Sequence, residues 1–355
     1  MNRLRILVGW VAAISIAAPA ATPYPVVRPG ITLRFPADHG AHPRFRTEWW
    51  YVTGWLRTAS GEDLGFQVTF FRTRPPGDEG NPSRFAARQV LFAHAALSDP
   101  AAGRLLHGER AARQGFGLAG ARTDDADIAI RDWRLRRSPD GQWATRVTAD
   151  GFALALDFRP TQPPLPQGRG GYSRKGPDPQ QASYYYSIPH LRVSGRVRRG
   201  NHDEPVSGEA WLDREWSSDY LAPRAQGWDW TGLNFDDGSA LMAFRIRRKG
   251  GGTIWAGGSY RRPGGAVAVL GPGDVAFRTL ATWRSPATGA VYPVKQELSI
   301  RVDGRIERWR LQPMFAAQEL DARRSGLPVY WEGAVSTRGG RGYLELTGYD
   351  RALRM

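Results

Sequence analysis

The sequence contains no cysteine. Disulfide bonds, thiol catalysis, thiolate metal sites and a bacterial lipoprotein anchor are therefore excluded for all 355 residues. A folded domain of this composition has to be held together by packing alone.

Lysine is almost absent as well. Only Lys175, Lys249 and Lys295 are present, so arginine supplies 46 of the 49 basic side chains behind the net charge of +15. These arginines are scattered along the chain, whereas a nucleic-acid-binding protein gathers them on one face or element. We interpret the charge as a solvated surface and expect no nucleic-acid partner. Weak peripheral association with an anionic membrane, or with a membrane transporter, is a further interpretation.

Long hydrophobic runs are also missing, with one exception at the start of the chain. Arg3 and Arg5 precede an apolar run from Ile6 to Ala18, and Ala18-Pro19-Ala20 has the small-x-small form of a cleavage site. This is the plan of a secretory signal peptide, and the run is too short for a comfortable membrane span. We predict a signal peptide over residues 1–20 and a periplasmic or secreted mature chain.

Motifs for metals and cofactors are weak or absent. His39 and His42 form one His-x-x-His pair in a loop, without the additional ligands that a zinc site needs. The sequence has no GxSxG elbow, no phosphate-binding glycine loop and no GxGxxG after a strand. We expect no metal and no cofactor, and a serine-hydrolase triad has no support.

Helix signals are rare after the leader, and short alternating runs such as 49–56 and 64–71 take their place. Clusters of Gly, Pro, Asp and Ser separate these runs, which is typical of antiparallel hairpins. We predict an all-β protein with short helices at 84–88 and 314–320. Residues 160–182 contain six prolines and four glycines and are predicted to form a long loop or lid.

Two segments of the chain resemble each other. Residues 50–56 and 228–234 both carry aromatic side chains before Thr-Gly and lead through a turn into a second apolar strand, with an offset of 178 residues. We therefore predict two similar β-units, over residues 21–200 and 201–355. Each has the size of an up-and-down barrel of about eight strands, and such barrels hold one small ligand.

The densest group of candidate site residues is Thr47-Glu48-Trp49-Trp50-Tyr51. In a strand, Glu48 and Trp50 share one face, whereas Trp49 and Tyr51 share the other. A buried glutamate needs a partner or takes a raised pKa. Glu48 is therefore either a proton donor beside aromatic rings or a structural residue bonded to backbone or arginine.

A second group is Trp211-Leu212-Asp213-Arg214-Glu215-Trp216. If the segment is extended, Asp213 and Glu215 project to one side and Arg214 to the other. Two neighbouring carboxylates can divide acid and base roles when their environments separate their pKa values. Alternatively, Arg214 anchors a carboxylate across the sheet, which is a structural role.

Two further groups combine aromatic and ionisable side chains. Asp229 lies between Trp228 and Trp230, and it is either a further acid or an ordinary solvated residue. Tyr184 and Tyr186 share one face of their strand. Tyrosine hydroxyls in an apolar cavity orient ligands or donate protons, and the alternative is simple aromatic packing.

Four motifs together resemble the AttH/CrtC family: Phe-Pro-Ala-Asp-His-Gly at 35–40, Thr-Glu-Trp-Trp-Tyr at 47–51, Asp-Arg-Glu-Trp at 213–216 and Gly-Trp-Asp-Trp at 227–230. This family contains bacterial lipocalin-like proteins related to carotenoid 1,2-hydratase (hydroxyneurosporene synthase), often described as predicted secreted hydrolases. The resemblance extends from about residue 30 to 350. It implies two tandem lipocalin-like antiparallel β-barrel domains.

The resemblance also implies a reaction. Hydratases of this family protonate an isolated carbon–carbon double bond with a carboxylic acid and then add water, and aromatic π faces stabilise the cation. Their His-x-Trp and Tyr-x-Asp elements have their nearest counterparts here in Trp228-Asp229-Trp230 and Tyr260-Arg261-Arg262. Arginine thus stands where carotenoid hydratases have an acid.

We predict an exported protein that encloses a hydrophobic, isoprenoid-like small molecule and acts as a cofactor-free hydratase or hydrolase. The alternative is a non-catalytic carrier or scavenger. Carboxylates that converge inside a pocket favour catalysis, whereas acids paired with arginines at a rim favour carriage. The candidate catalytic residues are Glu48, Asp213, Glu215 and Asp229. The candidate ligand-binding residues are Trp49, Trp50, Tyr51, Tyr184, Tyr186, Trp216, Trp228, Trp230 and Tyr260.

Overall fold

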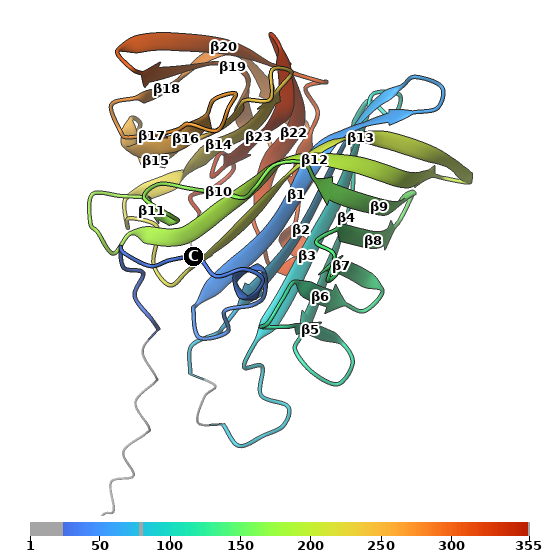
Figure 1. The fold of residues 1–355 in the computed structure, drawn as a ribbon. Coiled ribbons are helices and arrows are strands. Elements are labelled where there is room, and N and C mark those ends of the chain that lie inside the picture. Colours follow the sequence, from blue (N-terminus) through green and yellow to red (C-terminus); the bar gives the residue numbers. More distant parts are fainter. Residues whose placement is uncertain (1–23, 78–80, 354–355) are drawn as a thin grey trace, which may run out of the picture.

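The computed structural model describes residues 24–77 and 81–353, and its regular structure is almost entirely antiparallel β-strand (Figure 1). The strands of the first sheet are β1 (Thr47–Thr58), β2 (Asp63–Thr73), β3 (Val90–Asp99), β4 (Arg104–Arg113), β5 (Ala119–Ala121), β6 (Asp127–Ile130), β7 (Trp133–Arg137), β8 (Trp143–Ala149), β9 (Phe152–Pro160), β10 (Leu165–Pro166), β11 (Tyr172–Arg174), β12 (Ala182–Arg199) and β13 (His202–Ser217). The strands of the second half are β14 (Ala225–Phe235), β15 (Ala240–Arg248), β16 (Thr253–Arg261), β17 (Val267–Leu270), β18 (Val275–Arg284), β19 (Val291–Val302), β20 (Arg305–Pro313), β21 (Glu319–Asp321), β22 (Val329–Thr337) and β23 (Gly340–Thr347).

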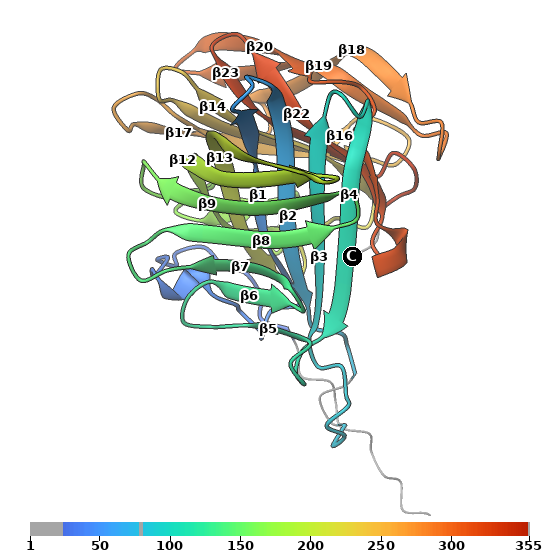
Figure 2. The ribbon, with the colours of Figure 1, turned by 90° about the vertical axis from the view of Figure 1, so that its right-hand side faces the viewer.

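The first sheet closes into a lipocalin-like barrel. Its strand order is β4-β3-β2-β1-β13-β12-β9-β8-β7-β6-β5, and the sheet folds over so that β3 and β4 lie against β6 and β8. Figure 2 shows β5–β9 crossing β1–β4 at a steep angle. Alternate side chains of each strand point inward, and Trp50, Trp133 and Trp143 are among the largest that are fully buried there.

The second antiparallel sheet also folds over on itself and forms a second barrel. Its strand order is β17-β16-β15-β14-β23-β22-β20-β19-β18, and β15 and β16 lie against β18. The interior is filled by aromatic and aliphatic side chains, including Tyr292, Trp309 and Trp331. The two predicted tandem lipocalin-like antiparallel barrels are confirmed.

The change from one sheet to the other falls between Ser217 and Ala225, because β12 and β13 both pair within the first sheet. The expected boundary at 200/201 coincides with the turn that joins these two strands. The predicted signal peptide, residues 1–20, lies outside the described residues. Among residues 24–77 and 81–353, no helix is both long and apolar enough to cross a bilayer.

The expected short helices are in other places than predicted. Residues 84–88 form a turn, and residues 314–320 lead into β21 instead of a helix, because backbone N–H groups of Met314 and Glu332 join that segment to β22. The described part of the chain has two 3-10 helices, Ala37–His39 and Arg323–Ser325. The segment 160–182 is not wholly irregular, since β10 and β11 pair with β12.

The internal repeat is real in topology, but its sequence offset is misleading. β1 and β14 occupy the same place, each between the last and the second strand of its own sheet. Trp50, however, points into the first barrel, whereas Trp228, 178 residues later, faces the junction between the barrels. Because side chains alternate along a strand, a difference of one residue in alignment reverses every facing.

Candidate functional site

A cavity of about 90 Å³ lies at the junction between the two barrels. The first barrel lines it through β1, β2, β12 and β13, and the second through β14, β15, β22 and β23. Its lining residues are Trp49, Tyr51, Thr69, Phe71, Lys175, Tyr185, Asp213, Glu215, Tyr220, Trp228, Trp230, Phe244, Ile246, Tyr330, Glu332 and Glu345. It is therefore an aromatic cavity that also contains four carboxyl groups and one ammonium group.

Six of the residues singled out from the sequence lie in this cavity: Trp49, Tyr51, Asp213, Glu215, Trp228 and Trp230. The strand alternation explains the set, because side chains at every second position of β1, β13 and β14 face the junction. The rings of Tyr51 and Trp230 meet edge to face with centroids 5.2 Å apart, which joins the two barrels.

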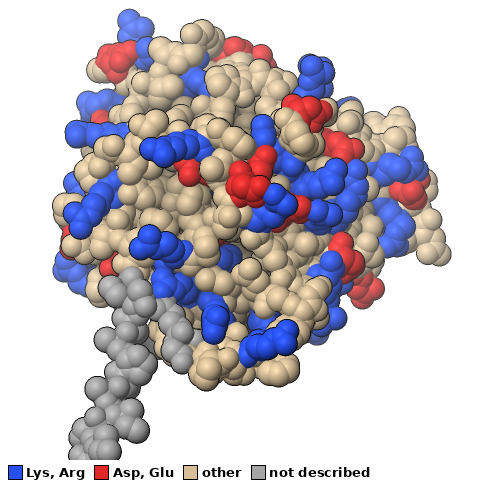
Figure 3. All heavy atoms as spheres, turned by 60° about the horizontal axis from the view of Figure 1, so that its bottom comes forward, with Lys and Arg blue, Asp and Glu red and all other residues tan. Residues whose placement is uncertain are grey.

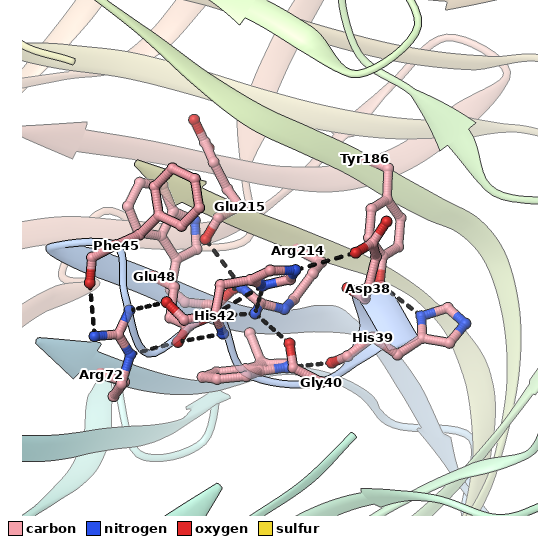
Figure 4. A network of polar contacts seen from close by, with 12 residues as sticks. Asp38, His39, Gly40, His42, Phe45, Glu48, Arg72, Tyr186, Arg214 and Glu215 are labelled. Carbon is pink, nitrogen blue, oxygen red and sulfur yellow. Dashed lines mark hydrogen bonds and ion pairs between the residues drawn. The ribbon is translucent and has the colours of Figure 1, made fainter. Parts of the chain in front are cut away.

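Glu48 lies elsewhere, inside the first barrel (Figure 4). Its carboxylate forms ion pairs with Arg72 and Arg214, and it accepts hydrogen bonds of 2.9 and 3.0 Å from the backbone N–H of His42. Burial opposes ionisation, but the charges of Arg214 and Arg72 outweigh it and hold the pKa of Glu48 well below its ordinary value. Glu48 is thus a permanently charged structural anchor.

Asp229 has the corresponding position inside the second barrel. It is fully buried between Arg245 and Arg247, at 2.7 and 2.9 Å, and it accepts a hydrogen bond of 2.9 Å from the Tyr349 hydroxyl. Its neighbours Trp228 and Trp230 point the other way, toward the cavity.

The remaining predicted aromatic residues also pack away from the cavity. Trp50 and Tyr186 belong to the first-barrel core, where Trp50 donates to the His39 carbonyl and the Tyr186 hydroxyl lies 2.6 Å from His39 Nδ1. Trp216 stacks on His42 at 3.9 Å, and Tyr184 bonds to the Arg28 backbone. Tyr260 packs in the second barrel beside Trp309.

Asp213 is held in the cavity wall by neutral donors only. The Tyr185 hydroxyl, the Ser187 hydroxyl and the Trp211 indole N–H donate to it at 2.6, 2.5 and 2.6 Å. Burial raises the pKa of Asp213 to about 7, even though these three hydrogen bonds favour the ionised form. Asp213 can therefore gain or lose a proton near neutral pH.

Glu215, two residues along β13, has a charged partner. Lys175 Nζ lies 3.0 Å from its carboxylate, and the Ser183 hydroxyl donates to the same oxygen. The ammonium group also lies 4.6 Å above the ring of Tyr185 and 4.3 Å above that of Phe244. The predicted loop 160–182 thus supplies the one cation among the cavity-lining residues.

Glu332 and Glu345 are the site residues that the sequence reasoning missed. They stand directly opposite each other on β22 and β23, and Trp230 of β14 flanks Glu345 on the other side. Burial raises the pKa of Glu345 to about 8, and the charges of Asp213 and Glu215 add to this effect. Burial and the charge of Glu345 raise the pKa of Glu332 well above its ordinary value.

A sequence signal for this pair was present. In both Tyr330-Trp331-Glu332 and Tyr343-Leu344-Glu345, a glutamate stands two residues after a tyrosine, so that both side chains lie on the same face of the strand. Glu332 is also next to a tryptophan in the sequence, as Glu215 is. The hydroxyl groups of Tyr51 and Tyr330 interact with the Glu332 carboxyl group, and these interactions favour its ionised form without outweighing its burial.

The cavity borders a wider hollow of about 310 Å³, which we call the vestibule. Phe71, Tyr220, Trp228, Tyr330 and Glu345 line both spaces. The vestibule itself is lined by the ends of β1, β2 and β3, by residues 218–221 of the inter-barrel connection and by residues 326–328. The cavity therefore adjoins a vestibule lined by two carboxyl groups, Asp219 and Glu345, and Glu345 also lines the cavity itself.

The chemistry available in the cavity is proton transfer beside aromatic π faces. The raised pKa values of Glu332 and Glu345 favour their protonated forms, whereas Asp213, with a pKa raised to about 7, changes its protonation state near neutral pH. Groups whose environments separate their pKa values can serve as acid and base in one reaction. Within the described parts of the chain, no group of three or more His, Asp or Glu side chains is placed to hold a metal ion.

Comparisons with known proteins agree with this architecture. The model of the AttH-like family matches residues 26–349. A Nitrosomonas europaea protein assigned to AttH is 52% identical, with a TM-score of 0.85 over 92% of this chain and 99% of that one. Kievitone hydratase from Nectria haematococca shares the fold at 12% identity, with a TM-score of 0.67 over 93% of this chain and 97% of that one.

Among curated proteins, human Protein spire homolog 2 is 32% identical over 93 residues, which is 26% of this chain and only 12% of that protein. The family model, in contrast, covers both barrels and both halves of the cavity wall. The chain belongs to the AttH-like family, with a lipocalin-like fold of the kind found in a hydratase.

Proposed function

We propose that the inter-barrel cavity binds a hydrophobic, isoprenoid-like molecule and hydrates one of its carbon–carbon double bonds without a cofactor. One observation carries the proposal: Asp213 and Glu332 are buried and Glu345 is half-buried in the wall of an aromatic cavity, none of the three is paired with an arginine among the described residues, and the pKa values of all three are raised. A carboxylic acid that stays protonated in an apolar site is a ready proton donor.

The proposed reaction begins with a proton transfer. Glu345 gives its proton to one alkene carbon, and the alkene π electrons form the new C–H bond. The positive charge that develops on the other carbon lies among the faces of Trp49, Trp228 and Trp230. Glu332 stands beside Glu345 and is a reserve of protons for it.

Water then completes the product. Its oxygen bonds to the cationic carbon while Asp213 accepts the released proton, and return of that proton to Glu345 restores the starting state. The net change is addition of one water molecule across one double bond. Tyr185, which donates to Asp213, and Lys175, which neutralises Glu215, keep this wall of the cavity in place.

Hydration is supported over the other functions considered. A carrier does not need uncompensated buried acids, which destabilise a fold, and none of the four cavity acids is paired with an arginine at a rim. A hydrolase could use the same acid and base, but the aromatic walls favour a carbocation. The structural neighbour named kievitone hydratase agrees with this choice, although at 12% identity it supports the fold alone.

The location of the protein is part of the proposal. The charged start, apolar run and Ala18-Pro19-Ala20 of the leader support export to the periplasm or outside the cell. Hydrophobic molecules are the expected partners there.

The test starts from the protein purified from its own host. Native mass spectrometry of that protein identifies the bound molecule, and turnover of that molecule in ¹⁸O-labelled water measures hydration. We expect E345Q and D213N to lower kcat by roughly two to four orders of magnitude and E332Q to lower it less. The control E307Q, on β20 outside the cavity, keeps full activity. Full activity in all three cavity variants would remove the mechanism.

A further inference from the structure

Two phenylalanines project into solvent at one end of the first barrel. Phe85 is 72% exposed and Phe116 is 53% exposed, which makes them the most exposed large hydrophobic residues that the structure describes. They come from different loops, between β2 and β3 and between β4 and β5, yet their rings stack with centroids 5.4 Å apart and planes 8° apart. The loop between β2 and β3 projects beyond the rest of this end in Figures 1 and 2.

The backbone holds Phe116 in this exposed position in an unusual conformation. Its φ is +56°, a region that residues other than glycine rarely adopt, and it lies between Gly115 at +100° and Gly117 at +69°. A strained backbone that presents an apolar ring to water does not serve the packing of the barrel. Strain of this kind points to a binding role.

One arginine packs on both rings, and two more, Arg84 and Arg88, lie in the loop that carries Phe85. The Arg113 guanidinium lies 5.3 Å from the Phe85 ring centre and 4.3 Å from that of Phe116, and it also donates to the Arg84 carbonyl at 3.3 Å. Arg88 lies in the same loop and donates to the Asn81 carbonyl. Within residues 24–77 and 81–353, no acidic side chain forms an ion pair with Arg84, Arg88 or Arg113. The loop's acidic residues, Asp78 and Glu79, lie outside the described residues.

The tip formed by Arg84, Phe85, Arg88, Arg113 and Phe116 lies at the end of the barrel where the vestibule is built. Thr73, the last residue of β2, pairs with Val90, the first of β3, so the loop between them starts beside the vestibule residues Phe71, Arg72, Thr73 and Phe92. Figure 3, in which this end comes forward, shows basic side chains distributed over the surface among acidic and uncharged ones.

We propose that this tip docks the protein on an anionic lipid bilayer, with Phe85 and Phe116 inserted at the headgroup boundary and the arginines on the lipid phosphates. Aromatic rings beside arginines are the combination that favours the interface of a charged membrane. A scattered exposed hydrophobic residue needs no explanation, but a stacked pair in a strained loop, with Arg113 packed on both rings, does.

This docking deepens the proposed function, because a hydrophobic substrate resides in lipid, and the docked protein takes it up through the vestibule. The delivery of substrate rests on the proposed function, whereas membrane binding itself does not. The two can therefore fail separately, and the experiment measures binding with no substrate present.

The absence of cysteine allows a site-specific probe. F85C and, as matched control, V269C each introduce a single thiol for an NBD fluorophore, and Val269 is an apolar residue 52% exposed on β17 of the second barrel. With vesicles of phosphatidylcholine and phosphatidylglycerol, NBD at position 85 gains intensity and shifts to the blue. NBD at position 269 remains unchanged. An equal response at both positions would overturn the proposal.

Unlabelled variants measure the affinity by vesicle co-sedimentation. F85S/F116S weakens binding roughly tenfold or more, R84Q/R88Q weakens it by a similar factor for phosphatidylglycerol vesicles, and V269S leaves it unchanged. Circular dichroism and hydration of the identified substrate in vesicle-free buffer remain those of the unchanged chain in F85S/F116S. Equal binding to purely zwitterionic vesicles, or no binding of the unchanged chain, would overturn the proposal, and the second result would point to a protein partner.

Discussion

The carboxylates in the interior of this protein fall into two groups, which differ above all in their partners. Inside the barrels, Glu48 and Asp229 each lie between two arginines. In the cavity between the barrels, Asp213 and Glu332 are equally buried and Glu345 is half-buried, and among the described residues no arginine forms an ion pair with any of the three. Lys175 compensates Glu215 alone.

The difference separates structural acids from reactive ones. Two neighbouring arginines keep a buried carboxylate ionised and make it a rigid anchor. A carboxyl group buried without a cation tends to keep its proton, and its burial lowers the stability of the fold. Residues that a protein retains at such a cost are candidates for function. The comparison yields predictions that differ in sign as well as in size.

The largest expected effect belongs to E48Q. This change leaves Arg72 and Arg214 buried without a negative partner, and it lowers the free energy of unfolding by about 3–5 kcal/mol in urea titrations. Because the folded pKa of Glu48 is depressed, its contribution is present above its ordinary value of 4.5 and is lost as the pH falls below that value. E48Q therefore shows less acid sensitivity than the unchanged chain, and an unaltered urea midpoint would contradict the anchor role.

E345Q is expected to change stability in the opposite direction. The folded pKa of about 8 lies above the unfolded value of 4.5, so the folded state holds more protons and the free energy of unfolding falls as the pH rises between these values. Replacing the acid by a neutral amide removes this penalty and stabilises the protein by about 2 kcal/mol at pH 8, with little change at pH 4. Unfolding titrations at both pH values measure the difference, and destabilisation at pH 8 would contradict the raised pKa.

K175M changes Glu215 from a carboxylate paired with a cation into a carboxylate without one. Without the ammonium group, Glu215 becomes a fourth uncompensated acid in the cavity. We expect a loss of about 1–2 kcal/mol in unfolding free energy, measured by urea titration, because the Glu215 carboxylate then lies buried without its cation. The double variant K175M/E215Q recovers most of the loss, and a loss that the double variant does not recover would indicate packing alone.

The smallest effect is expected where a similar ion pair is exposed. Arg122 and Asp124 are more than 60% exposed, and water screens their interaction. D124N should leave the thermal midpoint of the protein unchanged within measurement error. A clear shift would show that pairing with arginine, rather than burial of the pair, sets the stability of these sites.

Local patterning explains what could be predicted. Alternation correctly placed Asp213 with Glu215 on one face and Arg214 on the other, and it separated Glu48 and Trp50 from Trp49 and Tyr51. Alternation does not reveal which face is a barrel interior and which is a junction. Both faces of β1 are buried here, so apolar content could not decide.

The second half of the site depended on long-range pairing. Glu332 and Glu345 meet only because β22 and β23 pair and pack against the first barrel, and no local motif states that arrangement. The offset of 178 residues correctly identified two related halves. It matched residues that face different sides of their sheets, such as Trp50 in the first barrel and Trp228 at the junction. A one-residue difference in alignment is small in sequence and reverses the geometry of a strand.

The shared wall of the cavity has a consequence for the integrity of the chain. A protein severed between Ser217 and Ala225 would retain Asp213 and Glu215 on one fragment and Glu332 and Glu345 on the other. On either fragment alone the carboxyl groups of Asp213, Glu332 and Glu345 would meet bulk water, and their pKa values would return to the ordinary range. Reassociation of the two pieces would then be detected as the return of the raised carboxyl pKa values.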